Sequence, residues 1–480
     1  MNYSLSVYLL FSGLLLANTS SGQSHPYRFD LKAEKLDVPT SPWQVTQVLD
    51  LRTDRSRLGE VLQGLDNHRV SADFTQSLAT EVKQFVQVQM PRQPDARPVI
   101  MRVFTLGLSE VQRTSSEHAE AELVADFLEP QPDSSYRVLL SVGEFTRRGG
   151  LDVTKFHPAN LALVLQQALR QLVALPAAPS NHETLSHADA LAGLGGAAAR
   201  RFPIQAAGAA PKMGVYRNLQ EFLNNEPSEP AYPFTFEHIA HPGKRWAGTD
   251  EVQPNYLYTD NTHPTRPVST SGLWGISDGK ELLIAYHSRF YKLLPAADGR
   301  TYTFTGPPAF DAQAANTLAA AGAVAGLVGV AIASAANGAR QMDLYELRLA
   351  SGRVVPVQDD AQTNGFAKAP DSVRVYVYRR TDAAKNKTVT FSASGQNSME
   401  LQARNWTALT WRDRQHELKL CVRLGTGPEG CQEFVPDFSQ PTYLECTVPA
   451  DGGAPVLRAV SAKEGLFELR RIQRLRTVPY

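Results

Sequence analysis

Hydrophobic and polar positions change period several times along residues 43–175, a pattern that predicts an α+β domain. Residues 119–127 alternate between small or apolar side chains and acidic ones, as in a strand with one buried face. The apolar positions are Ala121, Leu123, Ala125 and Phe127, and the acidic positions are Glu120, Glu122 and Asp126. Apolar residues at helical spacing predict two helices, one capped by Ser71 and one opening at His157-Pro158.

The rest of the pattern is that of short strands separated by turns. Residues 213–356 are dense in aromatics and contain Asp-Gly turn signals, which predicts a β-rich domain. Residues 371–480 show strand patterns at short intervals, up to residues 465–469, and predict an antiparallel β-sandwich. Residues 176–211, rich in alanine, glycine and proline, are expected to form a linker. The expected fold class is therefore α+β and multidomain, with the middle domain interrupted by an Ala/Gly-rich helix.

That helix is predicted at residues 312–339, which carry no charged side chain. The segment is long enough to cross a bilayer, and Gly322, Gly326 and Gly329 supply small residues that allow close helix packing. Alanine and glycine nevertheless outnumber its strongly apolar residues. Three interpretations stay open: a helix packed against protein or in a homo-oligomer, a helix embedded in a membrane, and a loop.

The N-terminus has the pattern of a signal peptide. Residues 5–17 form an uncharged apolar run that is shorter than the ~20 residues of a membrane span. Small residues follow, and cleavage is expected after Gly22, so residues 1–22 would be the signal peptide. The mature chain is then extracytoplasmic, in the periplasm or on the outer face of the envelope. The alternative is an uncleaved anchor, because residues 1–4 contain no lysine or arginine.

Composition narrows the classes of function. The 480 residues include 48 Lys and Arg against 48 Asp and Glu, so the formal net charge is zero. That balance argues against a nucleic-acid partner. Three cysteines are too few for a disulfide scaffold, but Cys421 and Cys431 flank a turn-rich loop and would face one another across a hairpin. The alternative is three buried free cysteines.

A search for catalytic chemistry finds no nucleophile elbow, P-loop or zinc-protease signature. Residues 193–198 match GxGxxA formally, but no strand precedes them as a dinucleotide site requires. Histidines such as His238 and His241 lie in loops. Asp50, Arg52 and Asp54 form either a binding cluster or, more simply, the solvated end of a strand. We therefore expect no catalytic residue, no cofactor and no metal, although an enzyme that assembles distant residues would leave no local motif.

Three segments carry resemblances to bacterial envelope proteins. Asp50-Leu51-Arg52 through Leu58-Gly59, with the element order around it, resembles the auxiliary components of ABC-type transport systems. The middle segment, with its Ala/Gly insertion, resembles an uncharacterised family of exported bacterial envelope proteins. Residues 373–380 and the strand with Cys421 are similar to small envelope β-sandwich modules. These resemblances imply a location in the envelope and supply no catalytic residues.

Two functions follow from these expectations. The first is a non-catalytic exported envelope protein that acts as a binding, assembly or accessory component, with other envelope proteins as partners. The alternative is a membrane-inserting or transport-associated protein that uses residues 312–339. Extraction without detergent separates the two.

Overall fold

The structure is a computed structural model of the 480-residue chain, rich in strands, with 46% strand against 18% helix. The prediction of a multidomain, β-rich chain is confirmed. The residues described are 26–63, 68–112, 117–175, 183–206, 210–228, 234–239, 250–257, 265–296, 301–306, 343–357, 371–382, 384–394 and 398–477. Residues 1–22 and 312–339, including Gly322, Gly326 and Gly329, lie outside them, so the expected signal peptide and the expected Ala/Gly helix stay predictions.

The N-terminal domain (residues 26–206) is built on an eight-stranded sheet. Its three longest strands form an antiparallel meander: β5 (Arg97–Gln112), β6 (Glu117–Pro130) and β7 (Tyr136–Gly150). The shorter strands are β1 (Tyr27–Phe29), β2 (Trp43–Asp50), β3 (Gly59–Gln63), β4 (His68–Phe74) and β8 (Thr184–Leu185). Both β2 and β3 pair with β5 in parallel, one near each end of it. The loop between them, residues 51–58, therefore runs along the edge of β5.

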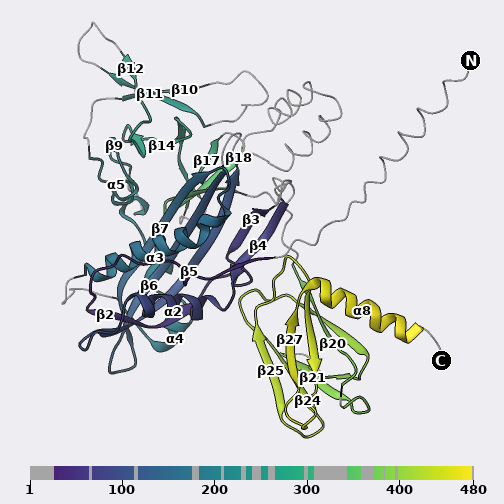
Figure 1. The fold of residues 1–480 in the computed structure, drawn as a ribbon. Coiled ribbons are helices and arrows are strands. Elements are labelled where there is room, and N and C mark those ends of the chain that lie inside the picture. Colours follow the sequence, from purple (N-terminus) through teal and green to yellow (C-terminus); the bar gives the residue numbers. More distant parts are fainter. Residues whose placement is uncertain are drawn as a thin grey trace, which may run out of the picture.

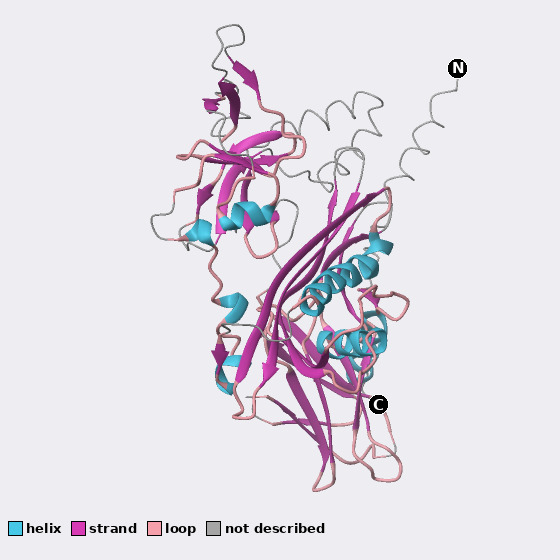
Figure 2. Ribbon diagram, turned by 90° about the vertical axis from the view of Figure 1, so that its left-hand side faces the viewer, coloured by secondary structure: helices cyan, strands magenta, loops and turns pink. Residues whose placement is uncertain are grey.

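Two helices cover one face of this sheet, α2 (Leu78–Gln89) and α3 (His157–Val173), as Figure 2 shows. The helices cover this face because the predicted alternation makes it apolar. Ala121, Leu123, Ala125 and Phe127 of β6 all lie in the core beneath the helices. The cap predicted at Ser71 is wrong: Ser71 lies in β4, and Ser77 accepts a hydrogen bond from the Thr80 N–H at the start of α2. The β-branched and aromatic residues before Ser77 favour a strand.

The opposite, acidic face of the sheet is also buried. Arg102 and Asp126 are both 0% exposed, and Arg102 Nη2 lies 2.5 Å from Asp126 Oδ2. Residues 183–206, predicted as a linker from composition, lie over this pair and contain α4 (His187–Leu191), η2 (Gly196–Ala198) and η3 (Pro203–Gln205). Arg102 Nη1 donates to the carbonyls of Ala190 and Leu194 at 3.1 and 2.9 Å. Backbone carbonyls of this segment thus help to compensate the buried charge of Arg102, and the same hydrogen bonds hold the segment on the sheet.

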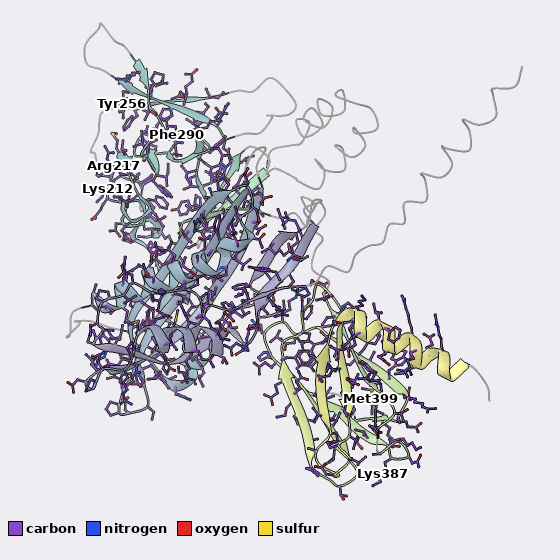
Figure 3. All side chains as sticks on the ribbon, in the orientation of Figure 1. Lys212, Arg217, Tyr256, Phe290, Lys387 and Met399 are labelled. Carbon is purple, nitrogen blue, oxygen red and sulfur yellow. A yellow bond between two sulfur atoms is a disulfide. The ribbon has the colours of Figure 1, made fainter. Side chains whose placement is uncertain are left out.

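The middle domain (residues 210–357) consists of small antiparallel sheets around an aromatic core. One sheet holds β9 (Gly214–Tyr216), β13 (Gly275–Ser277), β14 (Leu282–Tyr286) and β15 (Arg289–Lys292). Another holds β16 (Leu294–Pro295), β17 (Thr301–Gly306), β18 (Asp343–Arg348) and β19 (Arg353–Pro356). The third holds β10 (Phe234–His238), β11 (Val252–Leu257) and β12 (Thr265–Pro267). The short helix α5 (Leu219–Asn224) packs beside β9 and η3. Phe290, labelled in Figure 3, is buried in this domain.

The C-terminal unit (residues 371–477) has two four-stranded sheets that share one hydrophobic core. The first contains β20 (Val373–Arg379), β23 (Asn405–Trp411), β26 (Thr442–Thr447) and β27 (Val456–Val460). The second contains β21 (Val389–Ala393), β22 (Met399–Leu401), β24 (Leu418–Leu424) and β25 (Glu429–Phe434). Because β20 and β26 are parallel, the first sheet is mixed rather than purely antiparallel as predicted.

The last element that the structure describes is a helix that the sequence pattern did not predict. Residues 465–469, expected to form a strand, belong to α8 (Ala462–Thr477). Gly465, Glu468 and Ile472 are its buried residues, at the three- and four-residue spacing of one helix face. Its Gly465 lies against the Tyr443 ring, where a Cβ would come within 2.3 Å. Among the residues that the structure describes, none of the helices is both long and apolar enough to span a membrane.

Breaking the buried Arg102–Asp126 pair should strongly destabilise the N-terminal domain. Asp126→Asn keeps the size of the side chain but leaves the Arg102 guanidinium buried without a counterion. We expect the free energy of unfolding to fall by about 3 kcal/mol, measured by chemical denaturation. Arg137→Gln, at a half-exposed arginine, is the control and should cost less than about 1 kcal/mol. Equal losses for the two variants would contradict this account.

Candidate functional site

A cleft of about 550 Å³ opens on the acidic face of the N-terminal sheet, where three segments meet. Its floor is formed by β5 and β6, and one wall by residues 197–205. The turn between β18 and β19 in the middle domain forms the second wall, and residues 52–59 of the N-terminal domain form the third. The cleft therefore depends on the docking of the middle domain on the N-terminal sheet.

The floor is shaped by a β-bulge at Phe104. The pairing of β5 with β6 shifts register between Val103 and Thr105, so Phe104 is the extra residue. As a result, Phe104 and Thr105 both line the cleft, although neighbouring strand residues normally point to opposite faces. The β5 residues in the core beneath the helices accordingly change from odd numbers, ending at Val103, to even numbers, starting at Leu106.

The middle-domain wall lies on β7 at Gly143. A Cβ at Gly143 would lie 1.7 Å from the carbonyl oxygen of Ala350, so only glycine allows this approach. Arg348 and Arg353 donate to Glu122 Oε2 at 2.8 and 3.0 Å, and the Ser351 hydroxyl donates to its Oε1 at 2.5 Å. Burial acts to raise the pKa of Glu122, but the two arginines and Ser351 outweigh it and hold the pKa below its usual value.

The wall at residues 197–205 is positioned by the buried ion pair behind it. The Ala197 N–H donates to Asp126 Oδ1 at 2.9 Å. Gly196 has φ +55°, and a Cβ there would lie 2.3 Å from Asp126 Oδ2. Gly195, a glycine of the GxGxxA match, has φ +69°, and a Cβ there would lie 2.5 Å from Glu183 Oε1. The glycines of this turn thus allow the backbone to approach carboxylates of the protein itself, which gives them a role without a dinucleotide.

The loop at residues 51–58 contains the cluster that was expected to be a solvated strand end, and this expectation is wrong. Arg52 is 7% exposed and binds both carboxylate oxygens of Asp50, each at 2.9 Å. Its Nη1 also donates to the carbonyl of Arg57. Asp54 accepts hydrogen bonds from Ser56 and, at 2.8 Å, from Arg414 of the C-terminal unit. Asp50 and Arg52 are buried and Asp54 is paired because the loop lies between the sheet and a second domain, which the sequence pattern could not show.

The cleft has an excess of positive charge. Its lining includes two carboxylates, Asp54 and Glu122, and six arginines, Arg52, Arg57, Arg200, Arg201, Arg348 and Arg353. Arg52, Arg57, Arg348 and Arg353 form ion pairs. Among the described residues, Arg200 and Arg201 have no carboxylate within ion-pair distance. Burial lowers the pKa of Arg200, and Asp126 opposes the shift.

Arg200 and Arg201 are held at the rim by neutral groups. Arg200 Nη1 donates to the Ser141 carbonyl at 2.8 Å, and its guanidinium lies 4.7 Å from the centre of the Phe202 ring. Arg201 Nη1 donates to the Arg200 carbonyl. Guanidinium groups offer forked donors that match carboxylate and phosphate oxygens. Sequence reasoning missed both residues, although an Arg-Arg doublet in a segment otherwise poor in charge was a visible signal.

The ionisable side chains of the described lining belong to arginine, aspartate and glutamate. The described residues that line the cleft include no histidine, cysteine, serine or lysine. The structure joins Cys421 and Cys431, which face one another on β24 and β25, in a disulfide remote in sequence from the cleft. These two cysteines and Glu429 are the group of described residues close enough to hold a metal ion, and the disulfide withholds both thiolates. His238 lies 3.1 Å from Glu281, and His241 is outside the described residues.

The Glu122 cluster should make the docking of the middle domain sensitive to acid. The folded pKa lies below the unfolded value, so ionised Glu122 stabilises the folded state above about pH 4.5, and this contribution is lost as the pH falls through the folded pKa. We expect Glu122→Gln to be less stable than the wild type at neutral pH and the difference to shrink as the pH falls below about 4.5. Urea denaturation across this range measures it, and a difference independent of pH would contradict the assignment.

The chain matches no protein-family model, and searches of curated proteins and of solved structures find no match.

Proposed function

We propose that this protein is a non-catalytic, exported component of the cell envelope that binds an anionic ligand in the arginine-lined cleft. The observation that supports this most directly is the position of Arg200 and Arg201 at the rim, with no carboxylate partner among the described residues. Two guanidinium groups without an ion-paired carboxylate among the described residues, beside a pocket of this volume, would attract a ligand with carboxylate or phosphate groups. In this function, the protein acts as a binding, assembly or accessory component.

The domain plan supports a role in which one chain presents a ligand site and further surfaces. We propose that the C-terminal unit is a β-sandwich module, because its two sheets enclose one core. The disulfide between Cys421 and Cys431 is compatible with an oxidising compartment outside the cytoplasm, where such bonds persist. Export would depend on residues 1–22.

Removal of the two rim arginines should weaken anion binding. We expect Arg200→Ala/Arg201→Ala to lower the affinity for citrate or inorganic phosphate at least about tenfold, because each charged hydrogen bond contributes about 1.5–3 kcal/mol. Isothermal titration calorimetry on the full-length protein measures this. Arg374→Ala/Arg423→Ala, which removes two exposed arginines of the C-terminal unit, is the matched control. Equal loss in both variants, or no binding by the wild type, would overturn the proposed site.

Export can be tested by cell fractionation with alkaline carbonate washing and intact-mass measurement. We expect a soluble extracytoplasmic protein that lacks about 22 residues, because small residues follow an apolar run of signal-peptide length. Retention of the processed form in washed membranes would instead favour the membrane-inserting function through residues 312–339. Retention of the unprocessed form would indicate an uncleaved anchor.

A further inference from the structure

One loop of the N-terminal domain contacts both the cleft and the C-terminal unit. Residues 52–54 and Arg57 line the cleft. Between them, Arg55 turns to the C-terminal unit: its N–H donates to the Arg414 carbonyl at 2.9 Å, and its Nη1 donates to the Gln415 carbonyl at 2.9 Å. Figures 1 and 2 show the middle domain and the C-terminal unit at opposite ends of the N-terminal domain. The loop thus joins the cleft to a unit that does not line it.

Asp54 is the residue that belongs to both contacts. Asp54 is one of the residues that line the cleft, and its Oδ2 accepts a hydrogen bond from Arg414 Nη1 at 2.8 Å. Burial acts to raise the pKa of Asp54, but the hydrogen bonds from Ser56 and Arg414 outweigh it and keep the pKa below its usual value. Asp54 is therefore ionised at neutral pH. Its negative charge would repel an anion in the cleft, and Arg414 neutralises that charge from outside the cleft.

We propose that the docked C-terminal unit regulates the cleft: by placing Arg414 on Asp54, it raises the affinity of the cleft for an anionic ligand. This inference rests on the proposed function of the cleft. When Arg414 withdraws, the cleft keeps its arginines but gains an uncompensated carboxylate. Docking and anion binding then favour one another, and linkage requires that a bound anion also strengthens the contact with the C-terminal unit.

The contact between residues 54–55 and the C-terminal unit is polar, which makes the withdrawal of Arg414 from Asp54 accessible. It includes ion pairs and hydrogen bonds, with Arg55 Nη2 3.3 Å from Glu417 Oε1 in addition to the pair between Asp54 and Arg414. Arg414 also lies over the Phe438 ring at 4.3 Å within its own unit, so its position follows that unit. Half-exposed ion pairs are weak individually, which allows a ligand of modest affinity to shift the contact.

A double-mutant cycle on the full-length protein tests this coupling, with inorganic phosphate and citrate as probes in isothermal titration calorimetry. We expect Arg414→Ala to weaken binding about threefold to tenfold, the effect of one unpaired charge near the ligand in a medium of intermediate dielectric constant. Asp54→Asn should bind at least as tightly as the wild type, and Arg414→Ala should have no further effect in that background. Arg414→Lys should restore most of the affinity, which a purely structural role of the arginine would not predict.

The reciprocal effect is measured by hydrogen exchange of residues 412–417, which citrate should slow in the wild type and leave unchanged in Arg200→Ala/Arg201→Ala. Arg423→Ala, on the surface of the same unit, is the control for Arg414→Ala and should leave affinity unchanged. Unchanged affinity in Arg414→Ala, or an equal loss in the Asp54→Asn background, would overturn the coupling while the proposed anion site stands. No anion binding by the wild type would overturn the proposed function and this inference together.

Discussion

Charged residues on a buried sheet face set the main constraint on this fold. The N-terminal sheet carries apolar side chains toward α2 and α3, and on its other face it carries Arg102, Asp126, Glu120 and Glu122, all of them buried. Ionised groups leave water only at a high cost unless partners and hydrogen bonds compensate them. Arg102 and Asp126 pair with one another and Arg147 of β7 pairs with Glu120, but these residues also take partners from other segments of the chain. The order of the domains around the sheet follows from where those partners come from.

Two different segments supply the partners. Residues 183–206 satisfy Arg102 and Asp126 with backbone groups, whereas the β18–β19 turn satisfies Glu120 and Glu122 with Arg348 and Arg353. Because the two segments cover neighbouring parts of the same face without meeting over Phe104, a cleft is left between them. The arginines that compensate buried acids also make the walls of this cleft cationic. The proposed ligand site is thus a consequence of how the sheet buries its charges.

At the contact with the C-terminal unit, charged residues are again compensated by partners from another segment, but these residues are more exposed. Loop residues 51–58 are stabilised internally by the Arg52–Asp50 pair, so the neighbouring Asp54 and Arg55 hold fixed positions from which they bind the C-terminal unit. Asp73, in the adjacent strand β4, illustrates the burial of this region, since desolvation raises its pKa to about 6 even though Arg28 and Arg52 oppose the shift. Ion pairs and hydrogen bonds of Asp54 and Arg55 connect this loop to the C-terminal unit.

The sequence alone determined the local elements whose side chains follow a clear period. Alternation identified β6 and both of its faces, and helical spacing identified the buried face of α3. The turn between Cys421 and Cys431 identified a hairpin. Each of these patterns depends only on neighbours within a few residues, so the sequence is enough to reveal it. Tertiary structure alone decided that the acidic face is buried, that the supposed linker is a wall of the cleft and that Asp54 meets Arg414 across some 360 residues of sequence. The physical reason is that a charge pattern in sequence gives the side of the strand on which a residue lies. Whether water or a distant arginine compensates that residue depends on which segments the fold brings together.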